Sequence, residues 1–214
     1  MKKHITRLLF AALLLLALCI GASAAGTSGK CGPSAYWSFD SSTGTLTISG
    51  SGAMNDYEYG DYPWMDYRDS IQTIVIGDQI TQIGRYAFTG TACSTIKFGK
   101  NVRSIGERAF LECRNLNGDL TIPDSVQTIG DNAFEGCTGL TGKLTLGNGL
   151  QTIGFNAFYD CPFSGDLVIP DSVTMIGIQA FYCRPYYLPE TQGTLTLGRN
   201  LRTIGEFAFL KSRY

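Results

Sequence analysis

The stretch "LTIPDSVQTIGDNAFEGC", residues 120–137, decides the fold, because the chain repeats it. Its second half, I-G-x-x-A-F, occurs six times at steps of 22 to 28 residues. A recurrent unit of this length is the signature of a solenoid, in which each unit contacts its neighbours along the chain. The six copies begin at Ile83, Ile105, Ile129, Ile153, Ile176 and Ile204.

Each unit predicts a short strand followed by a tight corner. Leu120 and Ile122 are two residues apart, so both point to one side of a strand. Pro123, or glycine in other units, ends that strand, since proline cannot donate to a ladder. One unit cannot bury its apolar residues alone, so the units must stack. We expect a right-handed coil with a parallel sheet and an aromatic spine formed by Phe88, Phe110, Phe134, Phe158, Phe181 and Phe209.

The units resemble the BspA-like leucine-rich repeats of bacterial surface and secreted proteins. The resemblance covers Ile74 to Phe209, and the leader "WSFDSSTGTLTISGSGAM" is similar to the module that often precedes such repeats. It implies a β-rich, α/β horseshoe-like solenoid with a small N-terminal β cap. It also implies a non-enzymatic module for adhesion or protein binding, with an extracellular protein or a host or bacterial surface ligand as partner.

The N-terminus has the three parts of a secretory signal peptide. Lys2, Lys3 and Arg7 precede an apolar run from Leu8 to Ile20, and small residues follow it. The run is too short to span a bilayer as a helix. We therefore expect a signal peptide at 1–25, a leader or cap at 26–72 and six repeats at 73–214. The mature protein is expected to be secreted, or associated with the cell surface, without a transmembrane span.

Charge and histidine content argue against several functions. Without the signal peptide, 14 basic and 18 acidic residues give a net charge of −4. No basic patch of the kind that phosphate backbones require is present, which argues against nucleic acid. The only histidine, His4, lies in the signal peptide. A mature chain without histidine cannot use Ser-His or Cys-His catalysis, so we expect no enzyme, no cofactor and no metal site.

Six cysteines remain after removal of the signal peptide. Cys113, Cys137 and Cys161 each follow the repeat phenylalanine by three residues, so they should stack one above the other. Parallel side chains fit disulfide geometry poorly, and cysteine is a common small buried residue. We expect a reduced, buried ladder. An irregular disulfide among Cys31, Cys93 and Cys183 remains an alternative.

Two surfaces are candidates for partner binding. The longest connection, "YCRPYYLPETQG", carries Tyr182, Arg184, Tyr186 and Tyr187, a composition typical of interaction hot spots. Insertions in solenoids often serve binding. The second surface is the outward strand face, represented by Thr121, Thr145 and Thr196.

The segment "NDYEYGDYPWMDYRD", residues 55–69, mixes aromatic rings with carboxylates. A sugar-binding surface would need such residues, so a carbohydrate-binding accessory module using this segment is the alternative function. The segment also lies where a solenoid must cover the apolar end of its core. We therefore expect Pro63 and Trp64 to close that end, with Trp64 largely buried.

Overall fold

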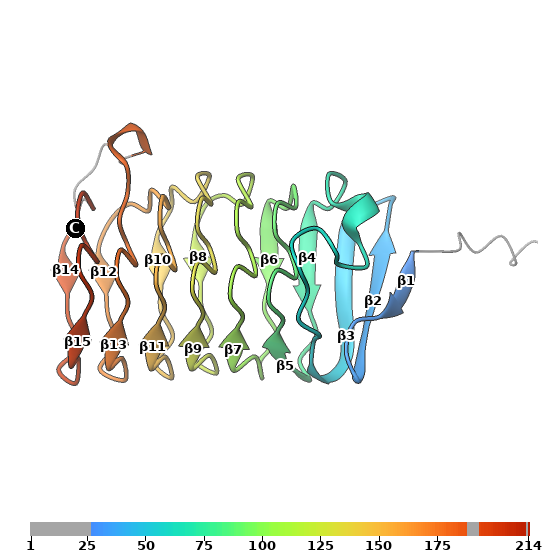
Figure 1. Cartoon of the computed structure of the whole chain (residues 1–214), viewed down its shortest axis with the longest axis horizontal. Coiled ribbons are helices and arrows are strands. Elements are labelled where there is room, and N and C mark those ends of the chain that lie inside the picture. The colour runs from blue at the N-terminus through green and yellow to red at the C-terminus, as the bar shows by residue number, and fades with distance from the viewer. Residues whose placement is uncertain (1–26, 188–192, 213) are drawn as a thin grey trace, which may run out of the picture.

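The computed structural model describes residues 27–187, 193–212 and 214, so the expected signal peptide lies outside the described residues. Figure 1 shows an elongated stack of turns with the N-terminal strands at one end. In the described part, helical structure is confined to two 3-10 turns, Met65–Tyr67 (η1) and Pro185–Tyr187 (η2). The repeat solenoid is therefore present, but turns and extended segments stand where an α/β horseshoe has α-helices.

Three antiparallel strands begin the described chain: β1 (Ser28–Lys30), β2 (Ser34–Asp40) and β3 (Thr45–Ala53). Alternate residues of β2 are buried, among them Trp37 and Phe39. The long strand β3 then starts both rows of the solenoid. Thr45 to Ile48 pair with β4 (Thr73–Ile76), and Gly52 and Ala53 pair with β5 (Ile80–Ile83).

The turns form two rows of parallel strands, where one parallel sheet was expected. The first row is one continuous ladder. After β5 it contains β7 (Ser104–Ile105), β9 (Thr128–Ile129), β11 (Thr152–Ile153), β13 (Met175–Ile176) and β15 (Thr203–Ile204). After β4 the second row contains β6 (Thr95–Lys97), β8 (Leu120–Thr121), β10 (Leu144–Thr145), β12 (Leu167–Val168) and β14 (Leu195–Thr196). The second row divides into separate ladders, β3–β4–β6, β8–β10 and β12–β14.

The six repeat phenylalanines stack through the middle of the coil. Neighbouring ring centroids lie 5.0 to 5.4 Å apart, from Phe88 at one end to Phe209 at the other. Phe88 to Phe181 are buried, whereas Phe209 in the last described turn is partly exposed. Trp64 continues the column beyond Phe88, with the two rings stacked at 5.4 Å. Burial of each phenylalanine contributes about 2–3 kcal/mol by area.

A left-handed backbone position recurs in every turn. The second residue after the repeat glycine has φ between 51° and 60° in all six units, although none of the six is glycine. Its N–H donates to the next turn in the first five units, for example from Asn132 to the Phe155 carbonyl at 2.7 Å. A non-glycine residue in this region costs free energy, so the inter-turn ladder holds it there. The six residues are Tyr86, Arg108, Asn132, Asn156, Gln179 and Phe207.

Aspartates, all but the buried Asp160 lying at the surface, join successive turns of the coil. In each case a carboxylate accepts the backbone N–H of a residue one turn later, at 2.7 to 3.2 Å. A carboxylate is a stronger acceptor than a carbonyl, so these bonds fix the vertical register of the turns. The aspartates are Asp56, Asp78, Asp119, Asp124, Asp131, Asp160, Asp166 and Asp171.

Candidate interaction surface

The loop after Phe181 is fastened to the preceding turn through Arg184. Asp160 is 1% exposed, and its Oδ1 accepts the backbone N–H of Arg184 at 2.8 Å. The guanidinium Nε donates to Asp160 Oδ2 at 2.6 Å, and Nη2 forms an ion pair with the same oxygen. The Arg184 side chain itself is 48% exposed. The guanidinium edge that carries Nε and Nη2 therefore neutralises the buried charge of Asp160, and the rest of the group remains available at the surface.

Tyrosines surround this arginine. Tyr159 and Tyr182, which belong to successive turns, stack with centroids 5.0 Å apart. The Arg184 guanidinium lies 5.9 Å from the ring centroid of Tyr159 and 5.6 Å from that of Tyr187. These distances permit cation–π attraction. Tyr187 also donates its backbone N–H to the Arg184 carbonyl at 3.0 Å, which closes the turn η2. Arg184 and its rings form a preorganised cluster.

Tyr186 is the part of this cluster that projects into solvent. It is 87% exposed, the largest value among the exposed large apolar and aromatic residues of the described chain. Its neighbours Tyr187 and Arg184 are held by the contacts above, so the backbone that presents Tyr186 is fixed. An exposed aromatic side chain on a fixed backbone binds a partner with little loss of conformational entropy.

The ionisation of this cluster is set by its contacts. Burial, followed by the negative charge of Asp160, raises the pKa of Tyr159 above its usual range. The hydrogen bonds to Asp160 raise the pKa of Arg184 further above its already high value. At neutral pH the phenol of Tyr159 is therefore protonated and the guanidinium is charged, so the cation–π pair and the ion pair coexist.

The structure divides the predicted binding residues between two places. Tyr182, Arg184 and Tyr187 share the cluster, and Tyr186 projects from it. Thr121, Thr145 and Thr196 are exposed on β8, β10 and β14 of the second row. In Figure 1 the η2 loop extends beyond one edge of the stack, away from these strands. The loop and the strand face are thus separate surfaces.

Sequence analysis missed two members of the cluster, Tyr159 and Asp160. They lie in "AFYDC" of the preceding unit, where the other units have glycine, glutamate, cysteine or lysine in place of Asp160. Asp160 and Arg184 are 24 residues apart, one more than the 23-residue step from Ile153 to Ile176. A search for opposite charges within one residue of a repeat step would therefore have identified the pair.

Two aromatic side chains of the segment 55–69, Tyr62 and Trp64, are directed inward, whereas Tyr59 is exposed. Trp64 is 0% exposed and donates its indole N–H to the Ala87 carbonyl at 2.9 Å. Tyr62 is buried and donates to the Thr89 carbonyl at 2.7 Å, whereas Pro63 between them is exposed. Trp64 thus covers the end of the phenylalanine column, and the expected contribution of Pro63 to closing that end is not seen. A ligand at the surface would not reach the Trp64 ring.

The cysteine ladder has a specific hydrogen-bond pattern. The thiols of Cys113, Cys137 and Cys161 donate to the carbonyls of Phe88, Phe110 and Phe134, one turn earlier, at 3.0 to 3.2 Å. Burial raises the pKa of Cys113 and Cys137 well above the usual thiol range, so both remain protonated. All six described cysteines are free thiols. The repeat cysteine is therefore a small core residue that also satisfies a buried carbonyl.

Residues 27–187, 193–212 and 214 contain no group of three or more potential metal-ligating side chains. Within that part of the chain, no helix has the length and hydropathy needed to cross a membrane.

Solved structures show the same fold. The T. pallidum leucine-rich repeat protein TpLRR is 20% identical, with a TM-score of 0.59, covering 79% of this chain and 82% of its own. A leucine-rich repeat protein from Bacteroides ovatus is 19% identical, with a TM-score of 0.51, covering 84% and 56%. The pneumococcal vaccine antigen PcpA is 18% identical, with a TM-score of 0.50, covering 82% and 51%. This chain thus spans about half the length of the latter two.

At the level of sequence, no curated protein matches the chain. The family model described as "BspA type Leucine rich repeat region" matches in six copies, over residues 61–183 and 117–214. These matches cover well over half of the chain and include every I-G-x-x-A-F block. The protein belongs to the BspA-type leucine-rich repeat family.

Proposed function

We propose that this protein is a secreted or cell-surface module that binds other proteins in adhesion, without enzymatic activity. Its repeat family suggests a protein-binding module, and members and structural neighbours of this family are typically non-enzymatic. Neighbours include a vaccine antigen, PcpA. The expected signal peptide at 1–25 supports export.

The observation that carries the proposal is the anchored arginine–tyrosine cluster. Tyrosine and arginine are the residue types most enriched at the energetic centres of protein interfaces. Here Asp160 holds Arg184, and Arg184 lies against two tyrosine rings. The exposed Tyr186 beside them is a suitable anchor for a partner's pocket. The remaining charged face of Arg184 favours an acidic or carbonyl-rich partner surface.

Binding assays with matched variants test this proposal. The chain without residues 1–25 is applied to immobilised extracellular-matrix proteins and, in parallel, to a glycan array. We expect binding to at least one matrix protein, and a loss of tenfold or more with Tyr186→Ala. The control is Tyr36→Ala, another exposed tyrosine, on β2, which should bind like wild type.

Two results would contradict the proposal. One is equal binding by wild type and Tyr186→Ala on every protein surface. The other is binding confined to the glycan array, which would favour the carbohydrate-binding alternative. Export is tested separately by expressing the full chain in a bacterium and sequencing the N-terminus of the protein in the medium or on the surface. Retention of residue 1 in the exported protein would contradict the signal peptide.

A further inference from the structure

The second row of strands is interrupted at two places. β4 pairs with β6, β8 with β10, and β12 with β14, but the described strands form no ladder between β6 and β8 or between β10 and β12. The first row runs past the same turns without a break. The interruptions are therefore local to one face of the coil.

One residue position explains both interruptions. Gly77 directly follows β4, and the equivalent residue, two positions after the end of each other second-row strand, is Gly99, Pro123, Gly147, Pro170 or Gly198. A turn with glycine pairs with the turn before it, and a turn with proline does not. The Gly77 N–H donates to the Ile48 carbonyl of the preceding turn at 2.8 Å. A proline at the equivalent position could not make this bond, because it has no N–H.

Steric fit also favours pairing at a glycine turn and separation at a proline turn. A Cβ on Gly147 would lie 2.3 Å from the Pro123 carbonyl oxygen, and one on Gly198 would lie 2.3 Å from the Pro170 oxygen. Glycine thus allows a close approach to the preceding turn that a proline ring prevents. Pro123 keeps its turn away from Gly99, and Pro170 keeps its turn away from Gly147.

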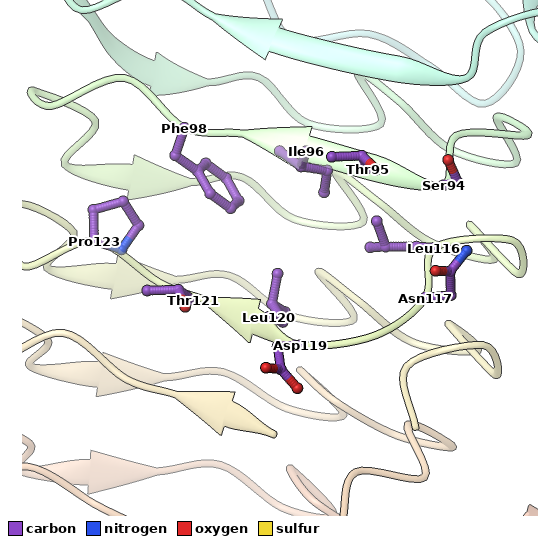
Figure 2. Close-up of a pocket in the computed structure, with 10 residues that line it drawn as sticks. All are labelled: Ser94, Thr95, Ile96, Phe98, Leu116, Asn117, Asp119, Leu120, Thr121 and Pro123. Carbon is purple, nitrogen blue, oxygen red and sulfur yellow. The ribbon is translucent and has the colours of Figure 1, made fainter. Parts of the chain in front are cut away.

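A cleft of about 360 Å³ lies at the first interruption, between β6 and β8. Figure 2 shows its lining residues, with Ile96 and Phe98 on one side and Leu120, Thr121 and Pro123 on the other. Ile96 and Phe98 are partly exposed, although the equivalent residues of the other interior turns are buried. The volume lies within the range of about 300–1,000 Å³ that is usual for ligand sites.

Both sides of the cleft present strand edges. Leu120 and Ile122 donate their N–H groups to the Lys143 and Thr145 carbonyls of the next turn, both at 2.9 Å. Because backbone groups alternate along a strand, the N–H and C=O of Thr121 point toward β6. On the other side, Thr95 donates its N–H to the preceding turn, so the backbone groups of Ile96 and Phe98 point toward β8.

The two turns that border the cleft are joined at one end. The Asn117 N–H donates to the Ser94 carbonyl at 3.3 Å, so the two turns are joined where β6 and β8 begin. Beyond this bond no ladder holds the strands together, and Pro123 stands at the far end. The cleft therefore opens along the strand direction and is suited to a short, extended ligand.

We propose that this cleft binds a short extended peptide segment of a partner protein by strand addition. A polypeptide backbone offers donors and acceptors that alternate at the same spacing as those of Ile96, Phe98 and Thr121. An apolar side chain of the peptide covers Ile96 and Phe98. The inference deepens the proposed protein-binding function, on which it rests for the class of partner, but it uses a surface separate from the Arg184 cluster.

The test selects peptides that require the cleft. A phage-displayed library of short random peptides is selected on wild-type protein, with counter-selection on Pro123→Gly, which should let β8 pair with β6 and close the cleft. The enriched peptides are synthesised with free backbone amides and, as a matched control, with N-methyl groups at alternate residues. We expect the unmethylated peptides to bind wild type, and Pro123→Gly or methylation to weaken binding tenfold or more.

Hydrogen exchange locates the bound peptide. The amides of Phe98 and Thr121 should exchange rapidly in the free protein and at least tenfold more slowly with peptide bound. Pro170→Gly is the control variant, because it acts on the second interruption and should leave this binding unchanged. Circular dichroism and thermal unfolding must show that both proline variants are folded.

Three results would overturn the inference. The first is that no selected peptide distinguishes wild type from folded Pro123→Gly. The second is that backbone methylation does not weaken peptide binding. The third is that the bound peptide slows hydrogen exchange at amides other than those of Phe98 and Thr121. Binding of oligosaccharides in place of peptides at these amides would also overturn it. Tyr186→Ala should bind the selected peptides like wild type, so failure of this site and failure of the Arg184 cluster are distinguishable.

Discussion

Single side chains determine how successive turns meet. Asp160 lies at the left-handed position two residues after its repeat phenylalanine, where Gly90 and Gly136 stand in other units. Its buried carboxylate accepts both backbone and side-chain bonds from Arg184. At the opposite end of the molecule, Trp64 takes the place that the next phenylalanine of the column would occupy. Asp160 and Trp64 thus each make a contact that the other turns of the coil do not make.

Removal of the Trp64 ring should destabilise the fold strongly. Trp64 is fully buried, stacks on Phe88 and contacts Trp37 edge-on at 5.9 Å. We expect Trp64→Ala to lower the free energy of unfolding by about 3–5 kcal/mol, the usual cost of deleting a buried aromatic ring. Urea denaturation measures this change. Tyr59→Ala, at a 64% exposed site, serves as the control, and an unchanged midpoint for Trp64→Ala would disprove the proposed capping role.

The Arg184–Asp160 pair should contribute more to stability than an exposed ion pair. Arg184→Gln leaves the buried Asp160 without its cation, so we expect a loss of about 1.5–3 kcal/mol. Arg199 and Asp171 form a matched pair, with side chains 82% and 49% exposed, and Arg199→Gln should cost about 0–1 kcal/mol. Urea denaturation of both variants gives the comparison. Equal losses would show that Asp160 is not effectively buried.

At the scale of strands, the choice between glycine and proline after a strand decides whether two turns pair. The strands of the second row are mostly two residues long, so each pairing rests on few hydrogen bonds. The bulk of the Pro123 ring, at a position where Gly147 approaches the preceding turn closely, is therefore enough to separate β6 from β8. The longer β3 continues into both rows and therefore fixes the first turn more firmly.

Gly147→Ala tests this explanation in a paired region. The added Cβ would lie 2.3 Å from the Pro123 oxygen, so β10 must move away from β8. We expect a loss of about 1–3 kcal/mol, as in other overpacked sites, and faster hydrogen exchange at the Ile122 amide, which donates to Thr145. Asn148→Ala is the control, since only the backbone N–H of Asn148 contacts Asp124. Unchanged exchange at Ile122 would contradict the steric argument.

At the scale of the whole molecule, stability is a sum of contacts between neighbouring turns. The aromatic column, the continuous first row and the inter-turn aspartates each recur along the coil. The last described turn has fewer such contacts. Its residues Leu197 and Ile204 are exposed, although the equivalent Ile169 and Ile176 are buried. The contacts that bury these residues come from the following turn.

The inter-turn aspartates predict a loss of stability in acid. Hydrogen bonds from Lys100 and Thr194 lower the pKa of Asp78 and Asp166. The pKa of each aspartate is therefore lower in the folded protein than in the unfolded chain, where it is about 3.9. The resulting stabilisation is complete when the pH is above the unfolded-state pKa, and it disappears as the pH falls through the folded-state pKa. The urea concentration at the midpoint of unfolding should therefore stay constant from pH 7 to about pH 5 and decrease when the pH is lower than about 4.

Two variants test whether Asp166 contributes to this loss of stability in acid. Asp166→Asn keeps an acceptor oxygen but cannot be protonated, so its stability should fall less steeply in acid than that of wild type. Asp61→Asn changes an exposed aspartate of the N-terminal segment and should follow the wild-type curve. Identical acid profiles for wild type and Asp166→Asn would remove Asp166 from the explanation.

The sequence by itself determined the solenoid, its repeat step, the stacked phenylalanines and the buried Trp64. The first three follow from a pattern of apolar residues that recurs every 22 to 28 residues and can be buried only by stacking. The burial of Trp64 follows from its place where the core must be covered. The tyrosine–arginine loop was also visible, because its composition departs from the repeat.

Only the tertiary structure decided the contacts that depend on the spacing between turns. Pro123 and Gly147 both predicted the end of a strand, and the sequence could not show that one separates its turn from the preceding turn and the other allows pairing. Likewise, Asp160 became part of the candidate site only when stacking brought it to Arg184. A repeat pattern specifies which side chains each turn buries. The distance between two neighbouring turns depends on backbone groups of both turns, and the sequence of one unit does not contain that information.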